Sequence, residues 1–516
     1  MYGLALLMYG LTLLMYGLAL LMYGLTLLMY GLTLLMYGLT LLMYGLTVPN
    51  EHKLKSLKQY KEENMTITPN KQETELAIDS SPISATNQEF NWRNCWYPVS
   101  FLQDLPKDKP YRFSLYDEPL VLFKNKDGKL GCIADRCSHR AARLSDGQII
   151  DGKIECLYHG WQFGIDGECL HIPQLPKEAK IPINSCIKSY LVLERQGIVW
   201  MWAGQIEAAD ETLIPTMPQL DDPKYVTMDL MSDRPYDQTY CIENILDPAH
   251  IPISHHGSDS HRKNAQPLEI QVLETSMNRI RGRSRNTRIP NANWLDLDFV
   301  APNLVIFRLY DFPKSGYELG LAHYSIPLGK GRCRVMARFY QNFSTWKIKL
   351  KPRWFAHFYR NRTLEEDLLL IQGAQEEIER LGQNLKEVYL PLKTSDTLVV
   401  EYRKWLDKFG SSLPFYQGYE TSKLPEKISD VQEHRVSVDR FSRHTQICSS
   451  CNRAYQITNL LKQTLIGIAI ALAALAILVD NSWISSAAVS GSLLAVALAF
   501  LAENMKTKFE RLYTRS

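Results

Sequence analysis

The sequence predicts an α+β protein with a small all-β domain first, a larger α+β domain next and two apolar helices at the C-terminus. Short apolar runs separated by Gly, Asp, Asn and Pro between residues 92 and 204 predict the β-domain. Strand-like and helix-like stretches between residues 208 and 434 predict the α+β domain. Two uncharged apolar runs, 464–479 and 484–502, predict the pair of helices.

Local patterns predict individual elements. The run 120–123, the turn-forming residues 125–129 and the run 130–134 predict a β-hairpin. The apolar run 304–307 predicts a strand of the second domain. The segment 364–385, rich in Leu, Glu, Gln and Arg, predicts a helix.

Composition excludes several classes of protein. The 516 residues are 46% hydrophobic and 22% charged, which is typical of a folded chain and excludes a disordered one. The 58 basic residues nearly balance the 55 acidic ones, so the net charge gives no reason to expect a nucleic-acid binder. Ten cysteines in this length are too few for a disulfide scaffold.

The N-terminal region differs from the rest of the chain. Residues 1–47 repeat the seven-residue units MYGLALL and MYGLTLL without a single charge. A transmembrane segment and a coiled coil are the alternatives, but copies this alike favour a non-functional extension that arose by repeat expansion. A secretory signal is disfavoured because no basic region precedes the apolar residues. Residues 48–88 are largely polar and are interpreted as a disordered linker.

Two boxes that each combine cysteine and histidine predict a first metal site. Cys137 and His139 form the first box, and Cys156 and His159 form the second. Because each box mixes the two ligand types, each loop can supply one ligand to each iron of a Rieske [2Fe–2S] cluster. A zinc site is the alternative, but the usual zinc spacing places two cysteines in one box and two histidines in the other. Each box is expected at the tip of a hairpin.

A second metal site is predicted around His250 and His255. Pro252 lies between these histidines and is expected to break a helix there, so that a kink brings both imidazoles to one metal. Two histidines and one carboxylate leave positions open for O₂ and substrate on a non-haem iron. The carboxylate is expected in the acidic segment 365–367. We select Asp367, with Glu366 and Glu365 as alternatives; the acids could also serve only to stabilise the start of a helix.

The C-terminal region adds a cysteine pair and the apolar runs. Cys448 and Cys451 form a C-x-x-C that is compatible with half a zinc site, with His444 nearby, or with a dithiol switch. The apolar runs span about 24–29 Å as helices, close to the thickness of a bilayer core. Basic residues flank their open end, which predicts a membrane hairpin with the catalytic domains on the cytoplasmic or stromal side.

The metal motifs resemble those of Rieske oxygenases. Respiratory and photosynthetic Rieske proteins carry an additional cysteine in each box, where this chain has residues such as Ala142 and Tyr158. Asn244, Asp247, His250 and His255 match the N-x-x-D-x-x-H-x₄-H signature of the oxygenases. The resemblance implies that both histidines bind iron. It also implies that Asp247 links His250 to a cluster histidine of a neighbouring subunit and carries the electron, with Asn244 beside it in the catalytic motif.

From about residue 89 onward the sequence resembles the pheophorbide a oxygenase-like family, which includes lethal-leaf-spot, Tic55-like and chlorophyllide a oxygenase proteins. The resemblance implies a helix-grip-like catalytic domain and oxygen insertion from O₂ into a chlorophyll-derived tetrapyrrole, with ferredoxin as electron donor. It further implies a homotrimer in a thylakoid or other membrane of a cyanobacterium or plastid, and a thioredoxin-responsive Cys448–Cys451 pair. The expected division is a Rieske domain at 89–205, a catalytic domain at 206–447, a C-x-x-C segment at 448–458, a transmembrane hairpin at 459–504 and a basic tail at 505–516.

Two other functions remain open from the sequence. One is a membrane-tethered Rieske electron carrier or redox sensor with an inactive second site. The other retains oxygenase chemistry on a non-tetrapyrrole aromatic compound or a sterol, because substrate choice depends on the shape of a pocket that the sequence does not reveal.

Overall fold

The computed structural model describes residues 89–423 and 438–512. The predicted repeat at 1–47, the linker at 48–88 and the last four residues of the basic tail lie outside the described residues.

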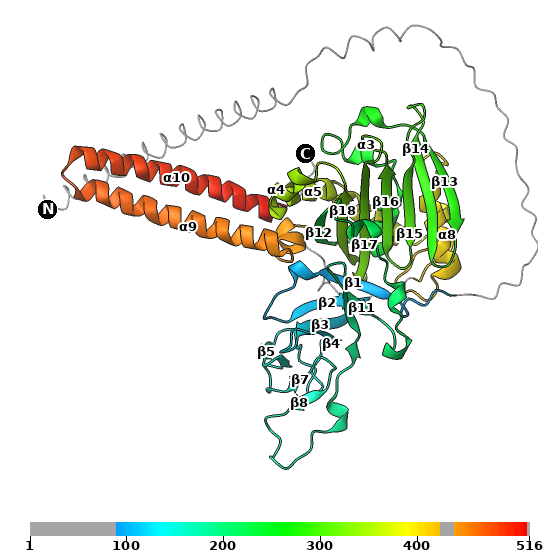
Figure 1. Ribbon diagram of the computed structural model, residues 1–516, viewed down its shortest axis with the longest axis horizontal. Coiled ribbons are helices and arrows are strands. Elements are labelled where there is room, and N and C mark those ends of the chain that lie inside the picture. The colour runs from blue at the N-terminus through cyan, green and yellow to red at the C-terminus, as the bar shows by residue number, and fades with distance from the viewer. Residues whose placement is uncertain (1–88, 424–437, 513–516) are drawn as a thin grey trace, which may run out of the picture. The chain divides into compact units, whose positions relative to one another are not determined.

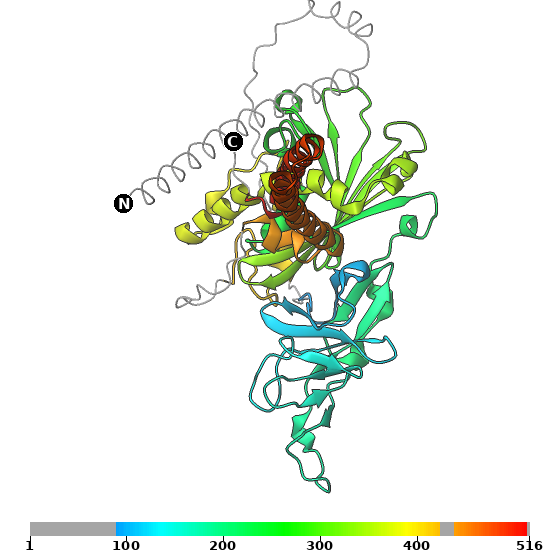
Figure 2. The ribbon, with the colours of Figure 1, turned by 90° about the vertical axis from the view of Figure 1, so that its left-hand side faces the viewer.

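The first folded region is a small β-domain made of three antiparallel sheets (Figure 1). The predicted hairpin is present, with Gly128 at φ +81° in its turn, a conformation that favours glycine. Figures 1 and 2 show the third sheet, β5 to β8, at the end of this domain that points away from the large sheet of the second region. The sheets are β1 (Trp96–Phe101), β11 (Ile198–Trp202) and β10 (Val192–Arg195); β2 (Tyr111–Leu115), β3 (Glu118–Lys124), β4 (Leu130–Ala134) and β9 (Ser189–Tyr190); and β5 (Gln148–Ile150), β6 (Lys153–Glu155), β7 (Gln162–Phe163) and β8 (Cys169–His171).

The second folded region is built on one antiparallel seven-stranded sheet. The predicted strand at 304–307 is part of β16. Gly282 in β14 leaves room for Leu398 of helix α8, because a Cβ at this glycine would lie 2.3 Å from the leucine side chain. The order across the sheet is β12 (Val226–Arg234), β18 (Arg332–Gln341), β17 (Glu318–Gly329), β16 (Leu304–Tyr310), β15 (Leu295–Val300), β14 (Arg279–Asn286) and β13 (Leu268–Thr275).

The two regions share one hydrophobic core. Buried aromatic residues of β1 and β11 pack together with apolar residues of the seven-stranded sheet and of α8. Trp200 of β11 meets Tyr324 of β17 edge to face, with ring centroids 5.5 Å apart. A second, separate core lies inside the small domain and includes Cys137 and Cys156. The predicted α+β class with a leading β-domain is therefore confirmed.

Helices cover and extend the large sheet. The predicted single helix at 364–385 is wrong in one respect, because the chain forms two successive helices that meet at Asp367. Gly382, at φ +63°, ends the second of them. The helices are α2 (Gln238–Leu246), α3 (Ile251–Ser254), α4 (Thr345–Leu350), α5 (Arg353–Glu366), α6 (Leu368–Leu381), α7 (Leu385–Val388), α8 (Thr397–Phe409), the π-helical turn η9 (Phe441–Thr445), α9 (Ser449–Leu478) and α10 (Ser482–Glu510).

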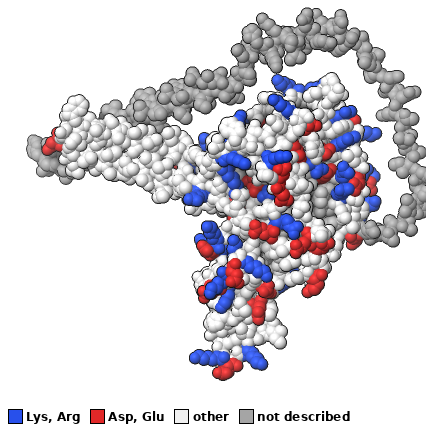
Figure 3. All heavy atoms as spheres, in the orientation of Figure 1, with Lys and Arg blue, Asp and Glu red and all other residues white. Residues whose placement is uncertain are grey.

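Helices α9 and α10 form an antiparallel pair (Figure 1). Both are long and apolar enough to cross a membrane. They begin and end beyond the apolar runs. Lys462 of α9 pairs with Glu503 of α10 over 2.8 Å at their open end. Figure 3 shows that the visible surface of the pair carries almost no charged side chains between its two ends. The predicted pair of apolar helices is confirmed.

Candidate metal centres

The two Cys/His boxes lie on loops with the same backbone hydrogen bonds. In each loop the cysteine N–H donates to the carbonyl five residues later, and the cysteine carbonyl accepts from the N–H four residues later. The residue at that fourth position has a positive φ in both loops, +57° at Ala141 and +75° at Gly160. Only the second loop is a hairpin tip, because the first connects β4 to β5, which belong to different sheets. The prediction of two hairpin tips is thus wrong for the first box.

The donor atoms of these loops are arranged in an inner and an outer pair. Cys137 and Cys156 are each 2% exposed and belong to the same buried core of the small domain. His139 and His159 lie farther out, with ring centroids 4.5 Å apart, and His139 stacks on Trp161 at 4.7 Å. Two thiolates inside and two imidazoles at the surface fit a Rieske cluster, in which one iron takes both cysteines and the other both histidines.

The second group of donors forms around helix α3. His250 and His255 stand immediately before and after this four-residue helix. Pro252 does not break a helix between them, as the sequence suggested; it lies in the first turn of α3, where no backbone N–H donor is required. The preceding helix α2 already ends at Leu246. The short helix, rather than a kink, sets the spacing of the two imidazoles.

Asp367 completes this second group from a distant part of the chain. Its Oδ2 lies 3.2 Å from His255 Nε2 and 3.7 Å from His250 Nε2, and one ligand atom of each of the three residues lies within 4.8 Å of the others. Asn244 donates its Nδ2 hydrogen to the same Oδ2 over 3.2 Å. Two histidines and one carboxylate on one side of a site are the donor set of non-haem Fe(II) oxygenases.

The three acids of the segment 365–367 have separate environments. Glu366 Oε2 lies 3.0 Å from His255 Nδ1, on the side of the ring opposite Asp367, and also accepts from Ser258 Oγ over 2.6 Å. Glu365 is 1% exposed and pairs with Arg440 and Arg443 at 2.6 and 3.1 Å. Only Asp367 directs its carboxylate between the two histidines.

Local charges keep Asp367 ionised. Burial alone would raise the pKa of its carboxyl, but the hydrogen bond to His255 and the charges of both histidines hold that pKa below its usual value. His250 is oriented by Asp247, whose backbone carbonyl lies 2.5 Å and whose Oδ2 lies 3.6 Å from His250 Nδ1. The site therefore offers an ionised carboxylate and an imidazole whose remaining nitrogen is held in place.

A cavity of about 550 Å³ lies beside the residues that lead into α3. Its lining includes Pro248 and Ile251 next to the histidines and Phe307 on the sheet. Lys263 and Arg288 supply positive charge to the same cavity. This volume falls in the range of binding sites for small organic ligands, and the mixture of apolar and cationic lining suits an apolar molecule that carries an anionic group.

The structure also gathers residues that sequence reasoning connected only in part. Cys448, Cys451 and His444 lie together as suspected, and His357 of α5 joins them as a fourth member. His357 was missed because nothing in its neighbourhood on α5 marks it as a ligand, and it is 87 residues from His444. The sequence signal that pointed here was the C-x-x-C with His444 nearby.

Comparisons with known proteins agree with the fold and the two donor groups described above. Residues 95–190 match the Rieske [2Fe-2S] domain family, and residues 299–384 match the pheophorbide a oxygenase family. The fold resembles the crystal structure of dicamba monooxygenase bound to dicamba, with a TM-score of 0.53 and 22% identity, covering 62% of this chain and 97% of that one. The fold and the two donor groups are those of a Rieske non-haem iron oxygenase, with a [2Fe–2S] cluster and a His/Asp mononuclear iron site as its cofactors.

Proteins with similar sequences identify one family within the Rieske non-haem iron oxygenases. The chloroplastic protein TIC 55 of Pisum sativum is 34% identical over 444 residues, which is 80% of this chain and 79% of the relative. The chloroplastic pheophorbide a oxygenase of Oryza sativa subsp. japonica is 29% identical and covers 83% of this chain and 85% of its own length. The chain belongs to the family of Rieske oxygenases that contains Tic55 and pheophorbide a oxygenase.

Proposed function

We propose that this protein inserts oxygen from O₂ into a chlorophyll-derived tetrapyrrole and receives its electrons from ferredoxin. The observation that carries the oxygenase part is the convergence of His250, His255 and Asp367 within 4.8 Å in a chain that also holds a Rieske domain. When bound, the cluster supplies electrons one at a time and the mononuclear iron activates dioxygen. A membrane-tethered electron carrier would need no such second donor group.

We assign the residues as follows. The cysteines and histidines of the two boxes hold the cluster, and the group of His250, His255 and Asp367 holds the mononuclear iron. Asn244 and Glu366 fix the orientation of Asp367 and His255 through the hydrogen bonds described above. Asp247, in contact with His250, connects the two centres across a subunit boundary in a homotrimer. In this arrangement a subunit that lacks the cluster regains activity when mixed with one that lacks the mononuclear iron.

The cavity beside α3 supports a tetrapyrrole as substrate. Apolar residues such as Ile251 and Phe307 suit a flat macrocycle, and Lys263 and Arg288 suit its carboxylate side chains. A relative that is also 29% identical, the chloroplastic flavonoid 8-hydroxylase 2 of Ocimum basilicum, favours a second candidate, an aromatic non-tetrapyrrole substrate such as a flavonoid.

We propose that the two apolar helices anchor the enzyme in a membrane of a plastid or cyanobacterium, such as the thylakoid. Chloroplast relatives support the compartment. Basic residues lie at the open end of the helix pair, whereas the charged residue in the loop between the helices is the acidic Asp480. Because basic residues favour the cytoplasmic side of a membrane, the catalytic domains face the cytoplasm or stroma. An apolar macrocycle partitions into the same bilayer. Family resemblance also nominates thioredoxin as a partner of Cys448 and Cys451.

The proposal is tested by aerobic turnover of the full chain in detergent with reduced ferredoxin. The substrates are a panel of chlorophyll derivatives with and without a free carboxylate, together with flavonoids, and products are identified by mass. A gain of one or two oxygen atoms in a tetrapyrrole supports the proposal. Oxygenation of flavonoids alone establishes the second candidate. If no substrate gives a product, and ferredoxin is oxidised at the same rate with and without substrate, the protein is a membrane-tethered electron carrier.

A further inference from the structure

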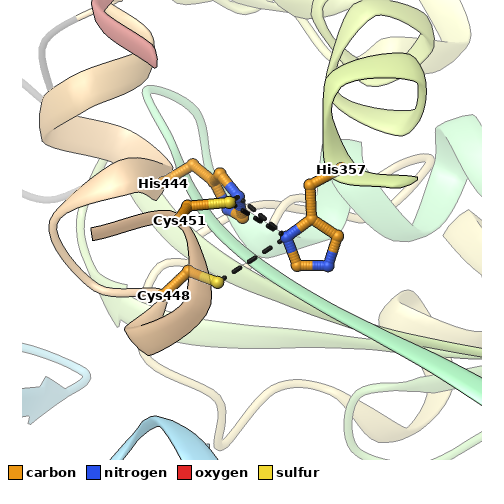
Figure 4. A group of neighbouring side chains, drawn as sticks. All are labelled: His357, His444, Cys448 and Cys451. Atoms are coloured by element: carbon orange, nitrogen blue, oxygen red, sulfur yellow. Dashed lines mark hydrogen bonds between the residues drawn. The ribbon is translucent and has the colours of Figure 1, made fainter. Parts of the chain in front are cut away.

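Four side chains that could hold a metal ion meet in the interior (Figure 4), in a group separate from that of His250, His255 and Asp367. Cys448 and Cys451 come from the turn where α9 begins, His444 from η9 and His357 from α5. Their exposed fractions are 0% and 1% for the two cysteines, and 1% and 0% for the two histidines. Neither cysteine forms a disulfide.

The distances between the donor atoms match a tetrahedral metal site. His357 Nδ1 lies 3.1 Å from His444 Nε2, 3.6 Å from Cys448 Sγ and 3.4 Å from Cys451 Sγ, and His444 Nε2 lies 3.2 Å from Cys451 Sγ. Zinc bonds of about 2.0–2.1 Å to nitrogen and about 2.3 Å to sulfur would place two nitrogens about 3.3 Å apart and a nitrogen and a sulfur about 3.5 Å apart.

Backbone carbonyls of β12 orient both imidazoles. His357 Nε2 lies 2.8 Å from the carbonyl of Asp229, and His444 Nδ1 lies 2.6 Å from the carbonyl of Met231. Because a carbonyl only accepts, each of these ring nitrogens carries the hydrogen, and the other nitrogen of each neutral ring presents a lone pair to the centre of the group. Two lone pairs that face each other over 3.1 Å repel unless a cation or a shared proton lies between them. Metal-bound histidines characteristically donate their second N–H in this way.

We propose that His357, His444, Cys448 and Cys451 bind a structural zinc ion. Two thiolates and two neutral imidazoles are a common donor set for structural zinc, and the ion with two thiolates forms a neutral unit that can be buried. Four protein ligands leave no open position, so the site performs no catalysis. This inference is independent of the substrate and electron donor proposed above.

The site joins three elements that the catalytic region needs in register. It ties the first turn of α9 to strand β12 and to helix α5, which ends at Glu366, directly before Asp367. The junction is reinforced on the same side by Asp104, which accepts from the backbone N–H of Ser449 over 2.8 Å and pairs with Arg353. Zinc therefore fastens the membrane hairpin to the catalytic sheet. This assignment is an alternative to the thioredoxin partnership that the family resemblance implies for Cys448 and Cys451, because thiol exchange requires an accessible sulfur that is free of metal.

The test is metal analysis and zinc-edge X-ray absorption on the full chain, purified in detergent and dialysed against a chelating resin. We expect about one zinc per chain, bound by two sulfurs at about 2.3 Å and two nitrogens at about 2.0 Å. Cys451→Ser should lower zinc content at least about tenfold while the Rieske absorbance is retained. Cys186→Ser, which alters an exposed cysteine of the small domain, is the matched control and should keep its zinc.

The zinc-edge X-ray absorption spectrum of the wild-type protein tests the proposal even if the Cys451→Ser variant fails to fold. Zinc without sulfur ligands, a Cys448–Cys451 disulfide in the protein as purified, or iron in place of zinc would each overturn the proposal. Rapid alkylation of both thiols in the folded wild-type protein would also overturn it, because a zinc site this deeply buried protects its cysteines.

Discussion

Asn244 donates a hydrogen bond to Asp367 over 3.2 Å and so connects α2 to the junction of α5 and α6, 123 residues later in the chain. The acceptor is the same Oδ2 that lies nearest to both His250 and His255. The amide therefore determines which carboxylate oxygen faces the imidazoles. Asp367 is held by hydrogen bonds from outside its own helices.

Asn244→Ala removes this donor and is expected to weaken ferrous iron binding at the mononuclear site about tenfold. The reason is that Asp367 gains freedom to rotate away from the histidines. Anaerobic titration of the apo-site with Fe(II) measures the affinity, and the Rieske absorbance should not change. Asn384→Ala, at an exposed position before α7, is the control. Unchanged iron affinity in Asn244→Ala would show that Asp367 does not depend on this bond.

Glu366→Gln tests the orientation of the other ligand. The carboxylate beside His255 Nδ1 favours the tautomer in which Nε2 is free to bind a metal and makes that nitrogen a stronger donor. The neutral amide should lower iron affinity about tenfold, whereas Glu387→Gln, at an exposed acid of α7, should leave it unchanged. If Glu366 were itself the iron ligand, its substitution would instead abolish binding and Asp367→Asn would retain it.

Glu365→Gln is predicted to destabilise the fold rather than the metal site directly. It leaves Arg440 and Arg443 buried without their shared carboxylate, which should cost about 3–5 kcal/mol in the free energy of unfolding. The matched control is Glu377→Gln, which breaks an exposed pair with Arg380 and should cost less than about 1 kcal/mol. Thermal unfolding in detergent measures both. Equal effects would show that burial of the Glu365 pair is unimportant.

The sequence predicted the architecture where local pattern determines structure. Alternating apolar runs and turn residues predicted the hairpin of β3 and β4, and uninterrupted apolar runs predicted α9 and α10. The region around Asp367 was harder. Leu, Glu, Gln and Arg favour a helix on both sides of this residue, so composition could not reveal that the chain turns there to direct a carboxylate toward His255.

Among the candidate site residues, those close together in the sequence were predictable, and those brought together only by tertiary structure were not. Short spacing made the two Cys/His boxes and the His250–His255 pair recognisable in the sequence. The separate environments of Glu365 and Glu366 were not predictable, because their partners lie in distant segments: Glu365 pairs with Arg440 and Arg443 at η9, and Glu366 with His255 next to α3. His357 could not be predicted either, because only tertiary packing brings α5 next to the C-x-x-C.

Asp237 predicts a pH dependence of stability. Removal from water raises the pKa of its carboxyl to about 7, although the N–H of Gly331 opposes the shift. An acid with a raised pKa binds its proton more tightly in the folded state, so the contribution of Asp237 to stability is lost as pH rises from about 4 to about 7. Asp237→Asn removes this contribution, so the difference in melting temperature between the wild-type protein and the variant should change over this interval. Asp108→Asn, at an exposed acid, should retain the wild-type slope; equal slopes in all three proteins would contradict the assignment.

The iron content of wild-type protein and of His250→Ala tests most directly whether the chain holds two separate iron centres. We predict about three irons per wild-type chain and about two in the variant, with the visible absorbance of the cluster unchanged. His256→Ala, which alters the exposed neighbour of His255, should keep all three. Two irons in the wild-type protein, or loss of the cluster together with the third iron in His250→Ala, would contradict two independent centres.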